Sequence, residues 1–306
     1  MKRDNSKECK RNLEDRMSKQ GVLLYLPALA VIFLVIAFPL VYALIMSFTN
    51  YKPTLKNVSF IGIDNYIRIL SDVKFWKAMG RSLFFTICSL SLQIVLGLAM
   101  AQLLNHKRLR CKMLFRGLAI TPWLIPTVSV ALIFKWMVND LYGIINFMLV
   151  GIGVIDEPYA WMSHGWSAML ILIVANVWRG TPLMITMFLA GLQGIPGDYY
   201  EAALVDGANA WYSFRKITLP LLLPVIMVSG VLRFIWTFNF YDLPWVMTQG
   251  GPAEATQTTP VYAYKSAFSA YRLGEGSAVS IILFFVLILF ALVYFKAKKM
   301  QDKIYK

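Results

Sequence analysis

Cysteine and histidine are scarce in this chain of 306 residues. The three cysteines, Cys9, Cys88 and Cys111, are odd in number and widely spaced, and none belongs to a Cys-x-x-Cys pair. This pattern indicates neither a disulfide framework nor a metal site. The two histidines, His106 and His164, lie in different predicted loops, where they are ordinary loop residues rather than metal ligands.

Sequence motifs of hydrolytic enzymes are also missing. The chain has no Walker phosphate-binding loop, no His-Glu-x-x-His and no Gly-x-Ser-x-Gly. We therefore expect no catalytic residues, no metal and no cofactor in this chain. If the protein moves a solute uphill, the energy must come from an ion gradient or from another subunit.

Acidic residues are few, with 16 Asp and Glu against 30 Lys and Arg and a formal net charge of +14. We expect no nucleic-acid partner, because the excess charge is typical of loops that face the cytoplasm and anionic lipid head groups. The predicted membrane spans hold no acid near their middle, and their embedded charges are Arg179 and Arg233. Ion-coupled transporters usually carry embedded acids, so this absence favours an external motor.

Long apolar blocks are what the chain does have. It is 58% hydrophobic, its mean hydropathy is +0.60, and the apolar blocks are 19 to 28 residues long. A helix of that length crosses about 30 Å of hydrocarbon, whereas a β-barrel shows segments of about ten residues with alternating polarity. The sequence predicts an all-α polytopic membrane protein in which one domain, 21–296, lies between an N-terminal tail, 1–20, and a C-terminal tail, 297–306. Its six predicted spans are about 22–48, 82–104, 113–137, 166–192, 221–241 and 277–295.

The distribution of basic residues predicts the orientation. With the termini inside, the inner segments hold 19 Lys and Arg and the outer loops hold 8. The positive-inside rule therefore predicts that both termini and the segment 196–220 are cytoplasmic. The first outer loop, 49–81, has six basic residues and is the exception. Its apolar residues from Tyr66 to Trp76 recur at helical spacing, which predicts a short helix lying flat at the membrane interface.

The segment 196–220 is too polar to span a bilayer. Asp198 and Glu201 have the spacing of a reciprocal capping box, which predicts a helix over 199–206. Gly207 is suited to end that helix in a left-handed conformation, and Asn209 is suited to cap a second short helix. The result is a stiff helix–glycine–helix unit with a surface suited to docking against another protein. A surface hairpin that merely joins two spans is the plainer alternative.

Three stretches carry a resemblance to a known family. Glu201-Ala202-Ala203, with Gly207 and then Ile217-Thr218-Leu219-Pro220 at the family spacing, resembles the EAA loop of ABC importer permeases. The stretch 248–252, Thr-Gln-Gly-Gly-Pro, together with 238–242, is similar to sugar-importer permeases of the maltose and glycerol-3-phosphate type, and to the first of their two membrane subunits in particular. The stretch 60–66 resembles the first outer loop of that family. The resemblance covers nearly the whole chain.

The resemblance implies an assembly. Two homologous permease subunits would form the pathway in the lipid bilayer of a bacterial inner membrane. Two cytoplasmic ATPase subunits, which hold ATP and Mg, would drive it, and an extracytoplasmic solute-binding protein would deliver the sugar. The short helix at Glu201 would seat in a cleft of the ATPase. The residues implied in this coupling are Tyr200, Glu201, Ala202, Ala203, Asp206, Gly207, Leu219 and Pro220.

The resemblance also implies a sugar path on the spans that flank the EAA loop. The matching positions are Asn176, Gly180 and Leu183 on the fourth span and Arg233, Trp236, Thr237 and Phe240 on the fifth. Aromatic faces stack on sugar rings and polar tips hold hydroxyls, so the residue types fit. Trp236 and Phe240 could equally be packing residues. An embedded arginine needs a partner or water. For Arg233 the candidate partners are an anionic substrate, Asp242 and the sister subunit, of which we favour the last two.

Two rival functions remain at this point. An ion-coupled secondary transporter would have an internal repeat with broken helices, and no clear repeat is visible in the sequence. A membrane-embedded scaffold without a substrate is the other.

Overall fold

The computed structural model describes residue 25 and residues 27–53, 58–106 and 109–304. Within these ranges the chain is almost wholly helical, and its only β-structure is one isolated bridge between Thr49 and Phe60. The predicted all-α class is thereby confirmed. The predicted N-terminal tail, 1–20, lies outside the described residues.

Five helical segments are long and apolar enough to cross a bilayer: Pro27–Ser47, Val73–Asn105 (α4), Gly165–Gln193 (α8), Ala210–Phe238 and Leu273–Lys296. The first includes the π-helical turn η1 (Phe33–Ala37) and α2 (Phe38–Ser47), the fourth includes α10 (Ala210–Ser213), η2 (Phe214–Thr218) and α11 (Leu219–Phe238), and the last is most of α14 (Leu273–Ile304). The shorter helices are α3 (Asp64–Ser71), α7 (Ile144–Gly151), α9 (Asp198–Val205), α12 (Asp242–Thr248), α13 (Thr259–Tyr264) and η3 (Lys265–Ser269).

The predicted third span, 113–137, is not one continuous helix. It consists of α5 (Lys112–Leu124) and α6 (Thr127–Met137), which meet at a bend of 93°. Ile125 and Pro126, between them, have extended backbone. A proline disfavours the helical conformation of the residue before it, so Pro126 accounts for the break. The continuous span is therefore corrected to a broken pair.

The second span begins earlier than predicted. The prediction started it at residue 82, but α4 starts at Val73, because Asp72 accepts a hydrogen bond of 2.8 Å from the backbone N–H of Lys74 and caps the helix. Asp72 also ends α3, so the predicted interfacial helix stops at Ser71 and Trp76 belongs to α4. In the same way, the predicted span 221–241 is a helix that begins at Ala210 and ends at Phe238.

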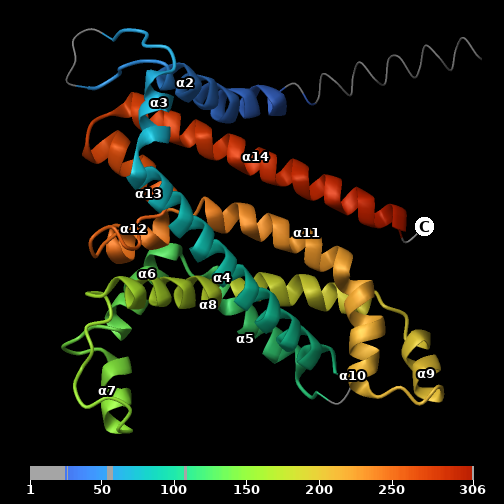
Figure 1. Ribbon diagram of the computed structural model, residues 1–306. Coiled ribbons are helices and arrows are strands. Elements are labelled where there is room, and N and C mark those ends of the chain that lie inside the picture. The colour runs from blue at the N-terminus through green and yellow to red at the C-terminus, as the bar shows by residue number, and fades with distance from the viewer. Residues whose placement is uncertain (1–24, 26, 54–57, 107–108, 305–306) are drawn as a thin grey trace, which may run out of the picture.

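Helix α8 is the centre of the bundle. Most of its apolar window is buried, and it packs against α4, α5 and α11. Figure 1 shows α4 crossing α8, with α11 running beside them. The crossing is close because Gly97 of α4 lies against α8, where a Cβ would come within 2.6 Å of the Met184 Cβ. Buried apolar side chains fill the space on either side, among them Phe85 and Phe188.

A second group of helices, α2, α3, α13 and α14, packs along one side of this centre (Figure 1). The buried side chain of Asn65 joins α3 to the end of α2, because its amide donates to the carbonyl oxygens of Ser47 and Thr49, both at 2.8 Å. The apolar side chains of the first span are almost all exposed. Helix α9 and the C-terminal end of α14 lie at one end of the molecule, and α3, α7 and α12 lie at the other (Figure 1).

Candidate functional sites: an exposed helical hairpin and a polar cavity

The segment 196–220 forms the expected helix–glycine–helix unit, with one difference. Gly207 has a φ of +77° just after the end of α9, as predicted. Asn209 caps the second short helix, also as predicted, because its side chain accepts a 2.8 Å hydrogen bond from the Tyr212 backbone N–H. The capping box is wrong: Gly197 is the N-cap of α9, and no side chain caps it. Asp198 and Glu201 instead lie within the first turn, where the positive end of the helix dipole favours acids.

The outer face of this hairpin is uncovered. Glu201 and Asp206 are exposed, and so are the neighbouring apolar side chains of Leu204 and Val205, at 74% and 88%. Figure 1 shows α9 projecting from the end of the bundle. One side chain ties it back, since the Tyr200 hydroxyl lies 2.9 Å from the Thr218 hydroxyl at the start of α11. The hairpin therefore has a free acidic and apolar face, and the Tyr200–Thr218 contact joins its first helix to the start of α11.

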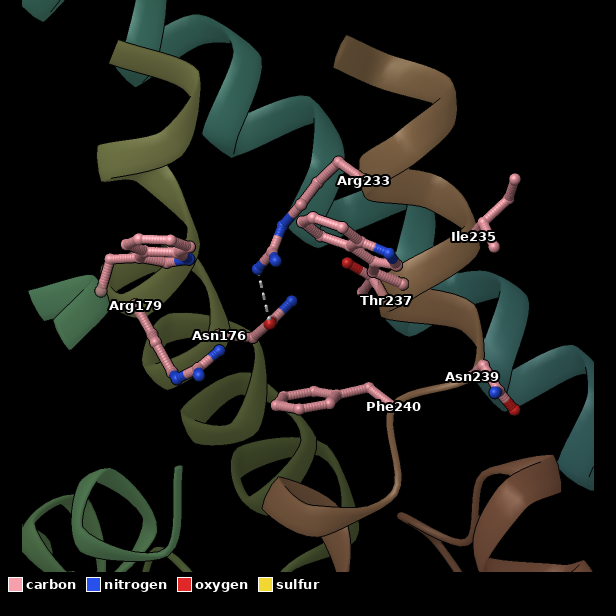
Figure 2. A pocket seen from close by; sticks show the side chains of 9 residues that line it. Asn176, Arg179, Arg233, Ile235, Thr237, Asn239 and Phe240 are labelled. Atoms are coloured by element: carbon pink, nitrogen blue, oxygen red, sulfur yellow. Dashed lines mark hydrogen bonds between the residues drawn. The ribbon is translucent and has the colours of Figure 1, made fainter. Parts of the chain in front are cut away.

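A cavity of about 370 Å³ lies between the middle of α8 and the C-terminal part of α11, and Trp123 of α5 also lines it. Five of the seven predicted path residues line it: Asn176, Arg233, Trp236, Thr237 and Phe240. Four further lining residues were outside that set: Trp123, Arg179, Ile235 and Asn239. Figure 2 shows the side chains of Asn176, Arg233 and Phe240 pointing toward one another across the cavity. Gly180 and Leu183 are not among the residues that line it.

The side chain of Arg233 joins three helices. It is 4% exposed, its Nε donates to Gln93 Oε1 of α4 at 2.7 Å, and its Nη2 donates to Asn176 Oδ1 of α8 at 3.1 Å. Gln93 in turn donates from Nε2 to the Asn176 carbonyl oxygen at 2.9 Å. Among the described residues Arg233 has no ion pair with Asp242 or another acid, so the predicted pairing with Asp242 is wrong. In the described part of the chain the side chain of Arg233 donates to two neutral amides, those of Gln93 and Asn176.

Gly180 makes room for this arrangement rather than lining the cavity. A Cβ at that position would overlap the Arg233 Nη2 and Gln93 Nε2 atoms. The resemblance implied a place for Gly180 in the sugar path, whereas in the structure Gly180 leaves the space that the guanidinium occupies.

Gln93, which holds Arg233 from α4, is a further residue that the sequence analysis missed. It belongs to a row of buried polar side chains on α4, one helical turn apart: Ser82, Thr86, Ser89 and Gln93. Polar residues that recur on one face of an apolar span are the signal that points to a buried network, because each polar atom inside a membrane needs a partner.

Aromatic side chains form the rest of the wall. The Arg179 guanidinium lies over the Phe240 ring, 5.9 Å from its centroid, and is half-buried. The indole of Trp236 is 51% exposed, and Phe240 is half-buried, so neither is enclosed in the core. The described residues contain no group of three His, Cys, Asp or Glu side chains that could hold a metal. Hydrogen-bond donors facing aromatic rings suit the binding of a polar, ring-shaped solute.

These features define a class of protein. Apolar spans, one of them broken, enclose a polar cavity, and an exposed hairpin carries a free face at one end; this is the fold of a membrane transport component. The chain belongs to the family of binding-protein-dependent transport system inner membrane components, which matches residues 93–303. It is therefore a multi-pass inner-membrane permease of the ABC importer type, and the ion-coupled alternative is set aside.

Named relatives agree with this assignment. The chain is 37% identical to the trehalose/maltose transport system permease protein MalF of Thermococcus litoralis, over 94% of this chain and 97% of the relative. It is 32% identical to the sulfoquinovosyl glycerol transport system permease protein SmoG of Agrobacterium fabrum, over 95% and 93%. The fold also matches a crystal structure of a bacterial ABC transporter involved in the import of the acidic polysaccharide alginate, with a TM-score of 0.80 and 21% identity over 96% and 100% of the two chains.

The network around Arg233 predicts a strong coupling between two substitutions. Gln93→Leu removes the acceptor of the Arg233 Nε and one donor to the Asn176 carbonyl. It should lower the free energy of unfolding by about 1.5–3 kcal/mol, as expected for a lost hydrogen bond to a charged group. Arg233→Met should be destabilising by itself. The double variant should be more stable than the sum of the two predicts, by about 1–3 kcal/mol. Thermal unfolding of the detergent-solubilised protein measures all three, and strictly additive effects would contradict the network.

Proposed function

We propose that this chain is one of two membrane subunits of an ATP-driven importer for a sugar or sugar derivative, and that it forms half of the pathway. The observation that carries the proposal is the cavity at Arg233, where amide, hydroxyl and guanidinium groups face Trp236 and Phe240. The names of the relatives support a sugar as the solute, since they are transport proteins for trehalose, maltose, lactose and sulfoquinovosyl glycerol.

The hairpin supplies the proposed contact with the motor. We infer that α9 docks in a cleft of a cytoplasmic ATPase subunit, which binds ATP and Mg, with Glu201 as its central contact. Its exposed acid and apolar neighbours, Leu204 and Val205, suit such a seat. Tyr200 is the link to the bundle through Thr218.

Helix continuity explains how movement of α9 reaches the cavity. The segment from Ala210 to Phe238 is one helical span, and Thr218 and Arg233 lie 15 residues apart on it. At 1.5 Å per residue that separation is about 22 Å. We infer that this helix, which includes Pro224, carries a shift at Thr218 to Arg233 and moves Arg233 against its partners on α4 and α8. That rearrangement is the proposed switch between inward and outward access.

The proposed orientation places both termini and the hairpin in the cytoplasm. The count of 19 inner against 8 outer basic residues supports it, and so does the position of α9 and the end of α14 at the same end of the molecule (Figure 1). An extracytoplasmic solute-binding protein would then meet the opposite end, near α3, α7 and α12. A related alginate transporter has been crystallised with its sugar-bound periplasmic protein. The second permease and lipid would cover the exposed apolar faces.

Substitutions in the hairpin test the coupling. Glu201→Ala should lower sugar uptake by about tenfold or more while ATP hydrolysis by the assembled complex continues, because one lost charge-assisted contact of about 1.5–3 kcal/mol is enough for that change. Gly207→Pro should have at least as large an effect, because proline cannot adopt a φ of +77°. Uptake and ATP hydrolysis are measured together in proteoliposomes that contain the whole complex.

Glu157→Ala, which removes an acid from the loop at the opposite end, is the matched control and should transport normally. Normal uptake by both hairpin variants would contradict the coupling role. Loss of uptake together with loss of the ATPase from the purified complex would show that the hairpin is an anchor rather than a transmitter.

Cysteine labelling tests the orientation. Cys111 is exposed at the start of α5, next to a strongly basic turn. In a Cys9→Ser, Cys88→Ser background, a membrane-impermeant maleimide should label Cys111 in inside-out vesicles and leave it unlabelled in intact cells. Labelling from outside the cell would reverse the proposed topology.

A further inference from the structure

We propose that the cavity binds an anionic sugar, and that a carboxylate, sulfonate or phosphate of the solute pairs with Arg233. This inference rests on the proposed function and specifies the chemical class of its substrate. It starts from an imbalance of charge: two of the nine lining residues are arginines, Arg179 and Arg233, and none is Asp or Glu. In the described part of the chain neither arginine forms an ion pair.

The partners that Arg233 does have are uncharged. The side-chain oxygens of Gln93 and Asn176 accept hydrogen bonds from the guanidinium but leave its full positive charge inside the bundle. A buried charge of this kind is costly unless an opposite charge or water meets it. A neutral sugar adds only further dipoles, whereas an oxyanion neutralises the charge.

Unpaired donors around the cavity point to the same ligand. Asn176 Nδ2, Arg179 Nε and Thr237 Oγ1 are buried, and none of them has a hydrogen-bond partner among the residues that the structure describes. Asn176 and Thr237 are only 1% and 2% exposed. Leaving a buried donor unpaired costs about 1–3 kcal/mol. An oxyanion offers several acceptor lone pairs and no donor, so it matches a site whose free atoms can all donate.

The geometry of the site also suits a ring attached to that anion. Figure 2 shows the Arg233 guanidinium, the Asn176 amide and the Thr237 hydroxyl on one side of the Phe240 ring. The aromatic faces of Phe240 and Trp236 can stack on a sugar ring. A volume of about 370 Å³ lies at the small end of ligand pockets, which are about 300–1,000 Å³, so the cavity suits one or two sugar residues at a time.

Matched pairs of sugars test the proposal. Each pair differs in the acidic group: methyl glucoside and methyl glucuronide, galactobiose and digalacturonate, and maltose and maltose 6-phosphate. The complete transporter, with its second permease, its ATPase and its binding protein, is reconstituted, and ATP hydrolysis and thermal stabilisation are measured with each sugar. The acidic member of at least one pair should act at a concentration about tenfold or more below that of its neutral partner, as expected for one charge-assisted contact.

The outcomes separate this inference from the proposed function. Stimulation by neutral sugars alone overturns the anionic ligand and leaves the sugar importer standing. Stimulation by no saccharide of either kind overturns both. A preference for acidic sugars supports both.

Substitution of Arg233 assigns any such preference to this cavity. Arg233→Gln should raise the concentration of acidic sugar needed for thermal stabilisation by about tenfold or more. Arg233→Lys should raise it less, because the charge remains without the forked geometry of the guanidinium. Arg116→Gln, an exposed arginine of α5 outside the cavity, is the matched control and should leave that concentration unchanged. Recovery of the second permease with each variant is measured alongside. An unchanged preference in Arg233→Gln overturns the proposal, and so does loss of the second permease, which would make Arg233 an interface residue.

Discussion

The burial of one guanidinium organises this permease. Arg233 is enclosed where α4, α8 and α11 meet, and its position depends on particular residues of the neighbouring helices. Gln93 accepts the hydrogen bond from Nε, Asn176 accepts the one from Nη2, and Gly180 leaves the space for the guanidinium. The crossing of α4 and α8 is held close by Gly97. A charge placed among neutral amides fixes the helices relative to one another and at the same time leaves the cavity positively charged. One interaction therefore shapes both the bundle and the site.

One helical span connects the cavity with the hairpin. It begins with α10 in the second half of the hairpin and continues into α11, whose C-terminal part lines the cavity. Because α10, η2 and α11 form one span from Ala210 to Phe238, the attachment of Tyr200 to Thr218 and the contacts of Arg233 belong to a single element. In the proposed mechanism the motor acts on one end of that element and the solute on the other. The two sites are then coupled through a continuous helix, and the change at the cavity is the exchange of Arg233 contacts on α4 and α8.

The membrane spans and the helix ends of the hairpin could be predicted from the sequence, because they depend on residues that are close together in the chain. Apolar blocks of bilayer length predict spans, and Gly207 and Asn209 end and begin helices through their own conformational preferences. Predictions failed where tertiary context decides. The span 113–137 was predicted as one helix, but the backbone at Ile125 and Pro126 leaves the helical conformation and breaks it. Asp198 had the spacing of a capping box, yet α9 starts one residue earlier. The partner of Arg233 was sought among acids, whereas its partner on α4, Gln93, lies 140 residues away in sequence, a pairing that only the packing of α4 against α11 reveals.

The most direct test of the central claim is an electron cryo-microscopy structure of the assembled importer with its transported sugar, trapped while the solute is inside the membrane. The account predicts density for the sugar between α8 and α11, with an oxygen of the sugar within hydrogen-bond distance of the Arg233 guanidinium and of the Asn176 amide. A sugar bound elsewhere in the pathway, with Arg233 paired to an acid of the second permease, would contradict it.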